Sequence, residues 1–418
     1  MTQSILQAIF GIIVFMFFCW LISEDRKSVN YKQAFSNLLM QGVVAAILLH
    51  IPFARKLIGF ISDGVIALKS ATLEGTKFVF GYLGGGDVPF DPKGTTFIFA
   101  FQTLPMVIVI SALSMLLFHL RILPIMVKGI SWAMKKAMGI GGALGVCSGA
   151  KIFLGQTEAP LLIKPYLKNM SRSELFTIMC MGFATTSIII IGLYAMILHK
   201  IVPYSTVHLL TASIISVLGA ITLSRIVVPD SSGPTEGKMV LPYEFTGSMD
   251  AISKGTGDGI RLFFNIIAML IVFVSLVSMG NRFLGLFPDF MGEPITLQRC
   301  LGVVMSPVAW LMGIPWQEAG AAGSLLGIKT ILNEFYAFTQ LSTLNDTALS
   351  VHSRTVMTYA LCGFANISSM GIMIGGLGSI VPEKRNDVLS LSFKALMVGT
   401  LASCLSGAVV GILMWPYL

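Results

Sequence analysis

Long apolar runs recur from one end of this 418-residue chain to the other. Hydrophobic residues make up 55% of the sequence and charged residues only 11%, whereas soluble domains carry roughly 25% charged residues. The runs are about 20 residues long, which is enough for a helix to cross the hydrocarbon core of a bilayer. The sequence therefore predicts an all-α polytopic membrane protein.

Eight transmembrane helices are predicted, at 4–22, 33–52, 97–119, 175–198, 206–224, 262–284, 357–381 and 396–416. The basic residues that follow spans 1, 3, 5 and 7 all fall on one side of the membrane, which the positive-inside rule makes the cytoplasm. Both termini are then expected outside. The net charge of +8 comes from basic residues scattered through these short loops rather than gathered into a patch. Nucleic acid is therefore not expected as a partner.

Two segments between the spans have a different character. Residues 54–82 mix charged and apolar residues at helical spacing, which favours an amphipathic helix in the membrane interface. The alternative is an external loop that packs on the protein. Residues 228–250 form the most polar stretch of the chain and are predicted to be an inside linker between two halves.

Residues 141–167 and 300–338 are apolar but too interrupted for one straight helix each. The interruptions are at Gly155 and Pro160 in the first, and at Pro307, 313–315 and Gly327 in the second. Irregular backbone at membrane depth is tolerated only where protein or a water-filled cavity covers it. Both segments are therefore predicted to be re-entrant helical hairpins.

Each predicted hairpin contains a glutamate in apolar surroundings, Glu158 in the first and Glu334 in the second. An ionisable group at the centre of a membrane costs about 2.5 kcal/mol or more, so its presence indicates function. Two such groups in separate halves of the chain predict a polar site near the middle of the bilayer.

A weak repeat relates the two halves. Residues 182–187 read GFATTS and residues 363–368 read GFANIS, and each motif follows a hairpin and precedes one more span. An odd number of crossings separates the two units, so the repeat is expected to be inverted. Interrupted segments at matching places in two halves indicate the substrate site of a transporter.

Polar side chains accompany the glutamates. Gln156 and Thr157 adjoin Glu158, where the alternative role is capping of the hairpin tip. Asn366, Ser368 and Ser369 interrupt span 7, where the alternative role is helix–helix hydrogen bonding. Carboxylates accept from vicinal hydroxyls, and amides can both donate to and accept from a heterocycle. The set suits a neutral polyol with amide-like groups.

Three phenylalanines, Phe183, Phe335 and Phe364, could pack on a flat ring, although lone aromatics in such segments are usually core residues.

The cysteines and histidines show no metal-binding spacing, and no phosphate-binding loop is present. An intramembrane enzyme and a channel remain as rival classes, and a transporter of another small polar solute is the closest alternative. Gradient-driven, saturable accumulation of the solute would distinguish a transporter from the first two.

Four motifs resemble those of the concentrative nucleoside transporters in their short bacterial form. They are GQTEAP at 155–160, GIPWQEA at 313–319, NEF at 333–335 and CGFANISSMGIMIGGLGSI at 362–380. The resemblance implies a homotrimer in the bacterial cytoplasmic membrane. Each subunit would have a scaffold and an elevator-like transport domain, and no cofactor would be needed.

The resemblance also implies a division of the chain and a role for each site residue. Residues 1–139 would be scaffold helices with an interfacial helix, 140–225 the first repeat, 226–295 the linker with scaffold span 6, and 296–418 the second repeat. By their place in the motifs, Gln156, Thr157 and Glu158 would contact the nucleobase, and Glu334, Asn366 and Ser369 the ribose. Phe364 would pack on the substrate, a nucleoside of the uridine, cytidine or adenosine type. Preference for one base would depend on the pocket around Gln156 and Ile190.

The coupling ion is the point at which the chain departs from the family. The resemblance places the sodium ligands at position 151, the Leu154 carbonyl, Thr185 and Thr186. Sodium-coupled relatives have asparagine where this chain has Lys151, and an ammonium supplies no oxygen ligand. We therefore expect the Lys151 ammonium to replace sodium near Glu158 and coupling to be to protons. If Lys151 instead extends out of the site, sodium coupling is the alternative.

Overall fold

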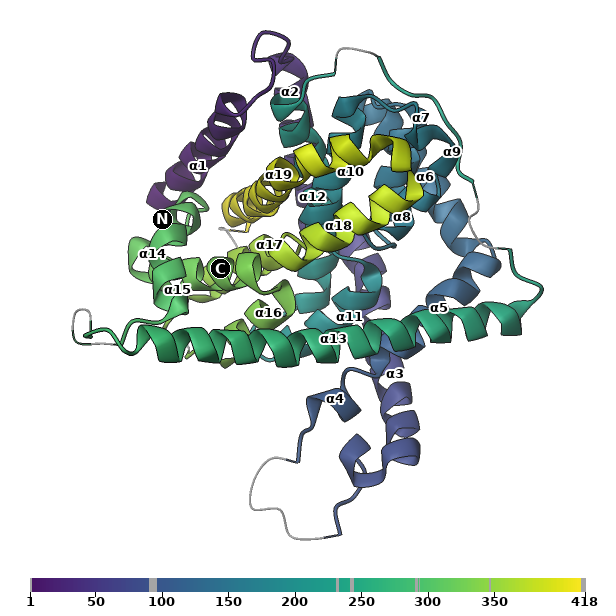
Figure 1. Cartoon of the computed structure of the whole chain (residues 1–418), viewed down its shortest axis with the longest axis vertical. Helices are drawn as coiled ribbons and strands as arrows, with labels where there is room; N and C mark the ends of the chain where they lie inside the picture. Colours follow the sequence, from purple (N-terminus) through teal and green to yellow (C-terminus); the bar gives the residue numbers. More distant parts are fainter. Residues whose placement is uncertain are drawn as a thin grey trace.

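The structure, a computed structural model, describes residues 2–89, 96–230, 233–240, 244–289, 292, 294–345 and 347–414. These residues form helices joined by turns and irregular loops, and none of them lies in a β-strand (Figure 1). This confirms the predicted all-α class. Parts of the predicted linker at 228–250 and the end of the last predicted span lie outside the described residues.

Among the described residues, six stretches are long and apolar enough to cross a membrane, judged by length and composition. They contain α1 (Thr2–Leu21), α2 (Tyr31–His50), the pair α4 (Phe99–Gln102) and α5 (Met106–His119), α12 (Ser205–Val227), α13 (Ser248–Leu284) and α19 (Arg385–Leu413). α13 begins at Ser248 rather than at residue 262, because the polar residues at its start continue the helix beyond its apolar part.

The two remaining predicted spans are each broken in the middle. The fourth is divided into α10 (Arg172–Ala184) and α11 (Ile188–Leu198), and the seventh into α17 (Val351–Leu361) and α18 (Ile367–Ile380). Both breaks overlap the repeated six-residue motifs found in the sequence. The order of hairpin, broken helix and continuous helix occurs twice along the chain, as predicted.

The first hairpin consists of α7 (Gly142–Lys151), a tip, and the short helices α8 (Glu158–Leu161) and α9 (Lys164–Leu167). The second consists of α15 (Trp316–Ile331) and α16 (Glu334–Thr343), with Leu332 and Asn333 between them. α14 (Leu297–Leu311) precedes the second hairpin and meets α15 at a bend of 117°. Glu158 and Glu334 are thus each the first residue of the helix that follows a hairpin tip.

Three of the predicted interruptions are wrong. Pro160 is the third residue of α8, where a helix tolerates proline because its first N–H groups have no intrahelical partner. Pro307 lies inside α14, which continues through it. Gly327 lies inside α15, where a Cβ would stand 2.3 Å from Leu301 Cβ. This glycine permits close helix packing rather than a break.

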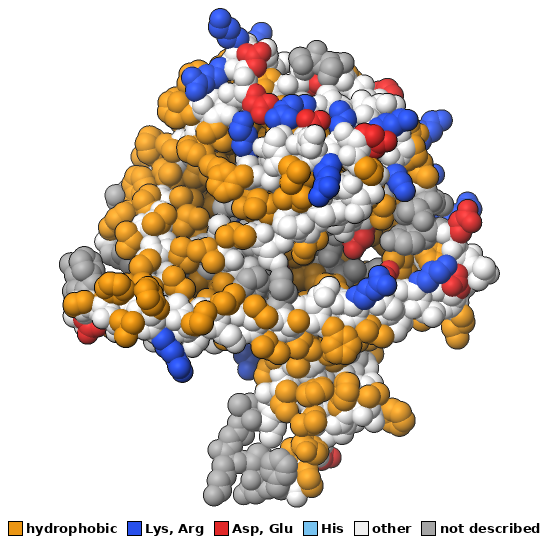
Figure 2. All heavy atoms as spheres, viewed as in Figure 1, with side chains coloured by type: hydrophobic (Ala, Val, Ile, Leu, Met, Phe, Trp, Pro, Cys, Tyr) orange, Lys and Arg blue, Asp and Glu red, His pale blue; other side chains and the backbone are white. Residues whose placement is uncertain are grey.

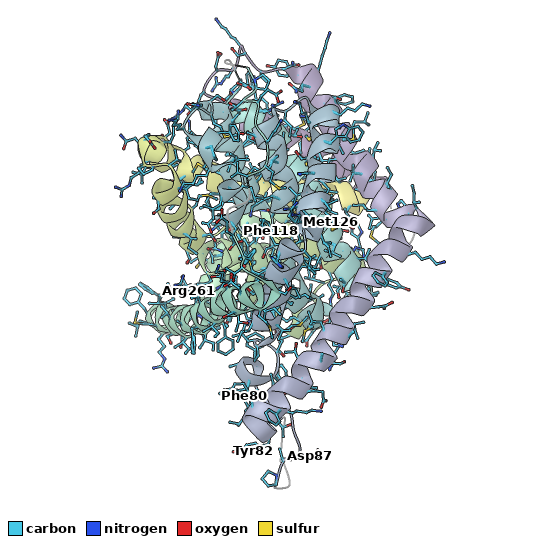
Figure 3. All side chains as sticks on the ribbon, turned by 90° about the vertical axis from the view of Figure 1, so that its right-hand side faces the viewer. Phe80, Tyr82, Asp87, Phe118, Met126 and Arg261 are labelled. Carbon is cyan, nitrogen blue, oxygen red and sulfur yellow. The ribbon has the colours of Figure 1, made fainter. Side chains whose placement is uncertain are left out.

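Residues 52–80 form the helix α3 (Pro52–Phe80), which agrees with the predicted helix and not with the alternative loop. Together with η1 (Gly81–Gly84) and α4, its lower end projects from the rest of the molecule (Figures 1 and 3). Phe60, Phe78 and Val79 are 76%, 89% and 67% exposed. The projection is mostly hydrophobic in Figure 2. Its position in the membrane interface remains a prediction.

The sequence did not predict α6 (Ile122–Met138), which was assigned to a basic loop. Leu123, Val127 and Met134 are buried on one side of this helix, whereas Lys128 and Lys136 are exposed. The exposed side also carries Ile125 and Trp132, each 67% exposed, so apolar residues occur all round the helix and the lysines between them obscured its periodicity.

Two sets of helix contacts describe the packing around the site. α1 and α2 pack on α12 and α19, and buried Gln41 donates a hydrogen bond of 3.0 Å to Ser406 of α19. α13 packs instead on α5, where Cβ atoms on Gly255 and Gly259 would stand 2.7 Å from Ala112 Cα and Ile108 Cα. The division into scaffold and transport domains proposed from the sequence stays a prediction.

A charged cluster lies at the end of the molecule opposite the α3 projection, where blue and red side chains gather in Figure 2. Arg172 at the start of α10 contacts both Glu24 carboxylate oxygens, at 3.0 and 3.1 Å, and Asp387 of α19 at 3.0 Å. Lys394 also contacts Glu24 at 3.0 Å. The cluster joins the α1–α2 loop to the starts of two helices that are distant in sequence.

Candidate functional site

A cavity of about 520 Å³ lies between the two hairpins, the two broken helices and α13. All eight residues predicted to contact substrate line it: Gln156, Thr157, Glu158, Ile190, Glu334, Phe364, Asn366 and Ser369. They come from segments up to about half the chain apart. The structure therefore gathers in one chamber the polar residues that the sequence placed separately at hairpin tips and helix breaks.

Three substantial helices begin at the wall of this cavity. The residues before α11, α16 and α18 are Ser187, Asn333 and Asn366, and all three line the cavity. The N-terminus of a helix carries partial positive charge and N–H groups without intrahelical partners. The broken helices and the second hairpin thus place favourable electrostatics beside the carboxylates of Glu158 and Glu334.

Glu334 lies at the centre of a hydrogen-bond network and is 5% exposed. Tyr194 OH donates to its Oε1 at 2.6 Å, and Asn366 Nδ2 donates to its Oε2 at 3.0 Å. Asn366 Oδ1 in turn accepts from the backbone N–H and the hydroxyl of Ser369, both at 2.7 Å. Each carboxylate oxygen still has a lone pair available for a substrate hydroxyl.

The first hairpin presents the other half of the polar surface. Glu158 Oε2 accepts a hydrogen bond from the Gly155 backbone N–H, which closes the tip. Gln156 donates from Nε2 to the Ser369 carbonyl at 3.3 Å and so joins the tip to α18. Among the described residues, buried Gln156 Oε1 has no hydrogen-bond partner. Buried polar atoms are rarely left unpaired, so this oxygen is suited to accept from a ligand.

Of the three phenylalanines considered, two line the cavity. Phe364 and Phe335 do so, and the Phe335 ring lies 6.3 Å from that of Tyr194. Phe183 is fully buried and is not among the lining residues. It packs against α19, where a Cβ on Gly399 would stand 2.4 Å from Phe183 Cβ. The core interpretation therefore holds for Phe183.

The sequence interpretation missed a whole wall of the cavity. Asp258, Arg261 and Asn265 of α13 line it, and Figure 3 marks the position of Arg261 on that helix. Their spacing of three and four residues places them on one face of a helix. This row of polar residues at the start of an apolar span could have indicated from the sequence that α13 lines a polar site. Tyr194, inside an apolar helix, was also overlooked.

Of the residues considered for ion coupling, Glu158 lines the cavity, whereas Lys151, Leu154, Thr185 and Thr186 do not. Lys151 ends α7 and is 1% exposed, and among the described residues its ammonium has no hydrogen-bond acceptor. It interacts electrostatically with Glu158. The Thr185 hydroxyl donates to the Met181 carbonyl at 2.7 Å, and the Thr186 carbonyl accepts from Ser213 at 3.0 Å.

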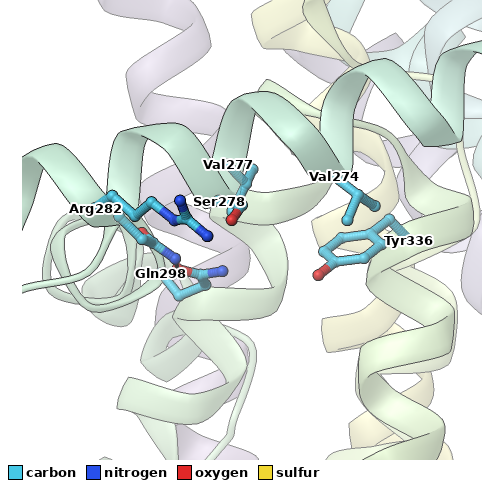
Figure 4. A pocket seen from close by; sticks show the side chains of 7 residues that line it. Val274, Val277, Ser278, Arg282, Gln298 and Tyr336 are labelled. Carbon is cyan, nitrogen blue, oxygen red and sulfur yellow. Dashed lines mark hydrogen bonds between the residues drawn. The ribbon is translucent and has the colours of Figure 1, made fainter.

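A second hollow, of about 380 Å³, lies between α13, α14 and α16. Figure 4 shows Tyr336 facing Val274 at one side and Arg282 beside Gln298 at the other. Asn281 accepts from the Leu297 backbone N–H at 2.9 Å and donates to Gln298 at 3.0 Å. Because its polar groups join α13 to α14 and it contains neither glutamate, we assign the substrate site to the larger cavity.

Comparison with known proteins agrees with this architecture. Family models for the N-terminal and C-terminal parts of Na+ dependent nucleoside transporters match residues 10–83 and 208–411. A third model, described as nucleoside recognition, matches residues 100–201. Together these models cover the regions that contain both hairpins and both broken helices.

Relatives of known name match nearly the whole chain. Nucleoside permease NupC of Helicobacter pylori is 35% identical over 99% of this chain and 98% of its own. Sodium/nucleoside cotransporter 1 of Rattus norvegicus is 32% identical, over 97% of this chain and 63% of its own. CNTnw in an inward-facing substrate-bound state is 32% identical with a TM-score of 0.88, covering 98% of this chain and 99% of that one. This chain therefore belongs to the concentrative nucleoside transporter family.

Proposed function

We propose that the protein imports nucleosides across the bacterial cytoplasmic membrane by secondary active symport. Membership of a transporter family excludes the rival interpretation of the two glutamates as the acid/base pair of an enzyme. The observation that carries the proposal is the single cavity lined by both Glu158 and Glu334. Its volume of about 520 Å³ is within the range of small-molecule sites.

The two ends of the cavity suit the two parts of a nucleoside. At one end, Glu334 can accept from the ribose hydroxyls beside Asn366 and Ser369, which are already fixed by hydrogen bonds. At the other, Gln156 has a free carbonyl oxygen and Glu158 and Thr157 adjoin it. Phe364 and Ile190 add apolar surface for the base. Uridine, cytidine and adenosine are the substrates to test first.

Uptake of labelled uridine into proteoliposomes tests nucleoside import. We expect saturable uptake that unlabelled nucleosides inhibit and that free ribose and free nucleobases do not, because neither fragment alone occupies both ends of the cavity. Accumulation above the external concentration, driven by an ion gradient, would exclude a channel. Failure of every nucleoside to compete would refute the proposed substrate class.

For the coupling ion we propose H+. The support is the buried Lys151 ammonium, which has no acceptor among the described residues and lies in the electrostatic field of Glu158. A fixed cation there repels sodium and supplies none of its oxygen ligands. Of the other oxygens considered for sodium, the Thr186 carbonyl already accepts one hydrogen bond, from Ser213. Proton movement would involve Lys151 and Glu158.

Uptake in sodium-free buffer at external pH 5.5 and 7.5, with the vesicle interior at pH 7.5, tests this assignment. We expect faster uptake at pH 5.5 and no stimulation by an inward sodium gradient at either pH. Strict sodium dependence without a response to pH would instead establish sodium coupling, the alternative noted from the family resemblance.

We also propose that the site moves across the membrane as in an elevator, within a homotrimer whose termini are both outside. Structures of CNTnw in inward-facing and intermediate states match this chain with a TM-score of 0.88. The helix α13, which packs on α5, has exposed apolar residues, including Phe264 and Ile271, that could meet lipid or another subunit. Native mass spectrometry in detergent tests the trimer, and accessibility of cysteines placed in the Glu24–Lys32 loop tests the orientation.

A further inference from the structure

A second lysine, Lys329, is buried beside the cavity. It belongs to α15 and is 0% exposed. Its ammonium donates to the Ala360 carbonyl at 2.7 Å and to the Ser403 hydroxyl at 3.0 Å. A buried charge is costly unless it is paired and hydrogen-bonded. Two close acceptors on two other helices indicate that the ammonium is retained for a specific role.

The two bonds of Lys329 fix the place where a broken helix ends. Ala360 is in the last turn of α17, whose final carbonyls have no intrahelical partner and carry partial negative charge. An ammonium there satisfies one of these carbonyls and opposes the charge. Ser403 belongs to α19, so the same side chain holds α15, α17 and α19 together.

The chain that leaves α17 leads directly to the glutamate network. After the break, Asn366 caps α18 and donates to Glu334 at 3.0 Å. Glu334 begins α16, five residues after Lys329. The second hairpin and the broken helix are thus tied twice, through Lys329 and Ala360 on one side of the hairpin tip and through Glu334 and Asn366 on the other.

Lys329 also supplies positive charge to this end of the cavity, because it interacts electrostatically with Glu334. The other repeat has a comparable arrangement, in which Lys151 precedes Glu158 by seven residues and interacts with it. The two lysines differ in one respect. The Lys329 ammonium has two acceptors, whereas that of Lys151 has none among the residues that the structure describes.

We propose that Lys329 is a positioning residue for the end of the cavity that binds substrate hydroxyls. It holds the end of α17, and therefore Asn366, where Glu334 can accept from a vicinal diol. The inference rests on the proposed function, since it assigns the hydroxyls of a nucleoside to this end. Lys329 itself does not line the cavity, so its effect on binding is exerted through Asn366 and Glu334.

The test compares binding of uridine and 3′-deoxyuridine by isothermal titration calorimetry on purified protein. We expect Lys329→Met to reduce the preference for uridine over 3′-deoxyuridine by about tenfold, the equivalent of one well-placed hydrogen bond. Preference between uridine and cytidine, which differ only in the base, should stay within about twofold of the wild type. A general loosening of the protein would change both preferences together.

Two further variants keep the test decisive. Ser403→Ala removes one acceptor and leaves the ammonium, so it should lower the same ribose preference by a smaller factor. Lys128→Met, on the exposed side of α6, should leave the ribose preference unchanged. If Lys329→Met does not yield folded protein, Ser403→Ala decides the question, and an unchanged ribose preference overturns the proposal.

The failure of this proposal is distinguishable from failure of the proposed function. If the wild-type protein binds no nucleoside, the function is refuted. If it binds uridine and Lys329→Met keeps the wild-type preference for the 3′-hydroxyl, the function stands and the role of Lys329 is refuted.

Discussion

Glu334 receives hydrogen bonds from two helices, and its charge is what makes those bonds strong. Glu334→Gln keeps the shape of the side chain but replaces one acceptor oxygen by a donor, which then faces the hydroxyl of Tyr194 or the amide of Asn366. We expect uridine affinity, measured by calorimetry, to fall about tenfold to a hundredfold, the loss of one charge-assisted hydrogen bond or more.

The matched control is Glu383→Gln, which changes an exposed carboxylate in η2 (Pro382–Lys384) that does not line the cavity. It should bind uridine like the wild type. Equal uridine affinity in the Glu334→Gln variant and its control would show that Glu334 does not contribute to substrate binding.

Lys151 offers a second test at the scale of one residue. Lys151→Asn removes the buried ammonium and supplies an amide oxygen near the Leu154 carbonyl. We expect uptake by this variant to become sodium-stimulated and to lose its response to external pH, because an oxygen ligand replaces the fixed cation. Uptake in proteoliposomes with crossed sodium and pH gradients measures both effects.

The control for that experiment is Lys128→Asn, on the exposed face of α6. Its ion dependence should be that of the wild type. A Lys151→Asn protein that binds uridine yet remains pH-driven and indifferent to sodium would contradict the role assigned to Lys151.

At the residue scale, the sequence predicted many of the cavity-lining residues because their signals are local. A carboxylate in an otherwise apolar segment is visible without knowledge of the fold. Asp258 and Arg261 were missed because they line the cavity only through the packing of α13 against segments that are distant in the sequence. Lys329 was missed although it carried the same signal as Glu334, a charge within an apolar run.

At the scale of elements, the two broken helices contact each other through their backbones. A Cβ on Gly363, in the break between α17 and α18, would stand 2.7 Å from the carbonyl oxygen of Ala184, which ends α10. Gly363→Ala must therefore separate the two breaks. Overpacking of this kind costs about 1–3 kcal/mol, so we expect a lower apparent Tm and weaker uridine binding.

Gly371→Ala provides the comparison within the neighbouring helix. A Cβ at Gly371 of α18 would meet no atom within 4 Å. Glycine in a helix is less favourable than alanine by about 0.5–1 kcal/mol, so this variant should be as stable as the wild type or slightly more so. A Gly363→Ala protein with the Tm and affinity of Gly371→Ala would show that the close contact between breaks is unimportant.

The elements themselves were predictable to different degrees. Apolar length located the continuous spans, and polar residues next to Gly or Pro located the hairpins. The exact breaks were not predictable from proline and glycine alone. Gly327 continues a helix because it packs on Leu301, and α6 was obscured by the lysines interspersed among its apolar residues. In each case a tertiary contact or a neighbouring surface decided the local conformation.

At the scale of the whole molecule, the charged cluster ties together three distant parts of the chain. The Arg172 guanidinium, assisted by Lys394, lowers the pKa of Glu24 below its usual value. A carboxylate with a lowered folded-state pKa contributes stability above its unfolded pKa of about 4.3 and loses it as the pH falls through the folded value. The contribution is small, about 1 kcal/mol or less, because the cluster is partly exposed.

Glu24→Gln should therefore have a lower apparent Tm than the wild type at pH 7, and the difference should shrink as the pH is lowered below about 4. It should also shrink in high salt, which screens partly exposed charges. Thermal unfolding of both proteins across this pH range gives the answer. A Tm difference that grew with acidification would have the wrong sign for a lowered pKa.

The central claim for the whole molecule is that nucleoside entry carries protons inward without sodium. The most direct measurement follows a pH-sensitive dye inside sodium-free proteoliposomes when uridine is added outside. The account predicts that uridine acidifies the vesicle interior, and that Glu334→Gln, which weakens binding, reduces the signal at the same uridine concentration. Uptake of uridine without acidification, or uptake that requires sodium, would contradict it.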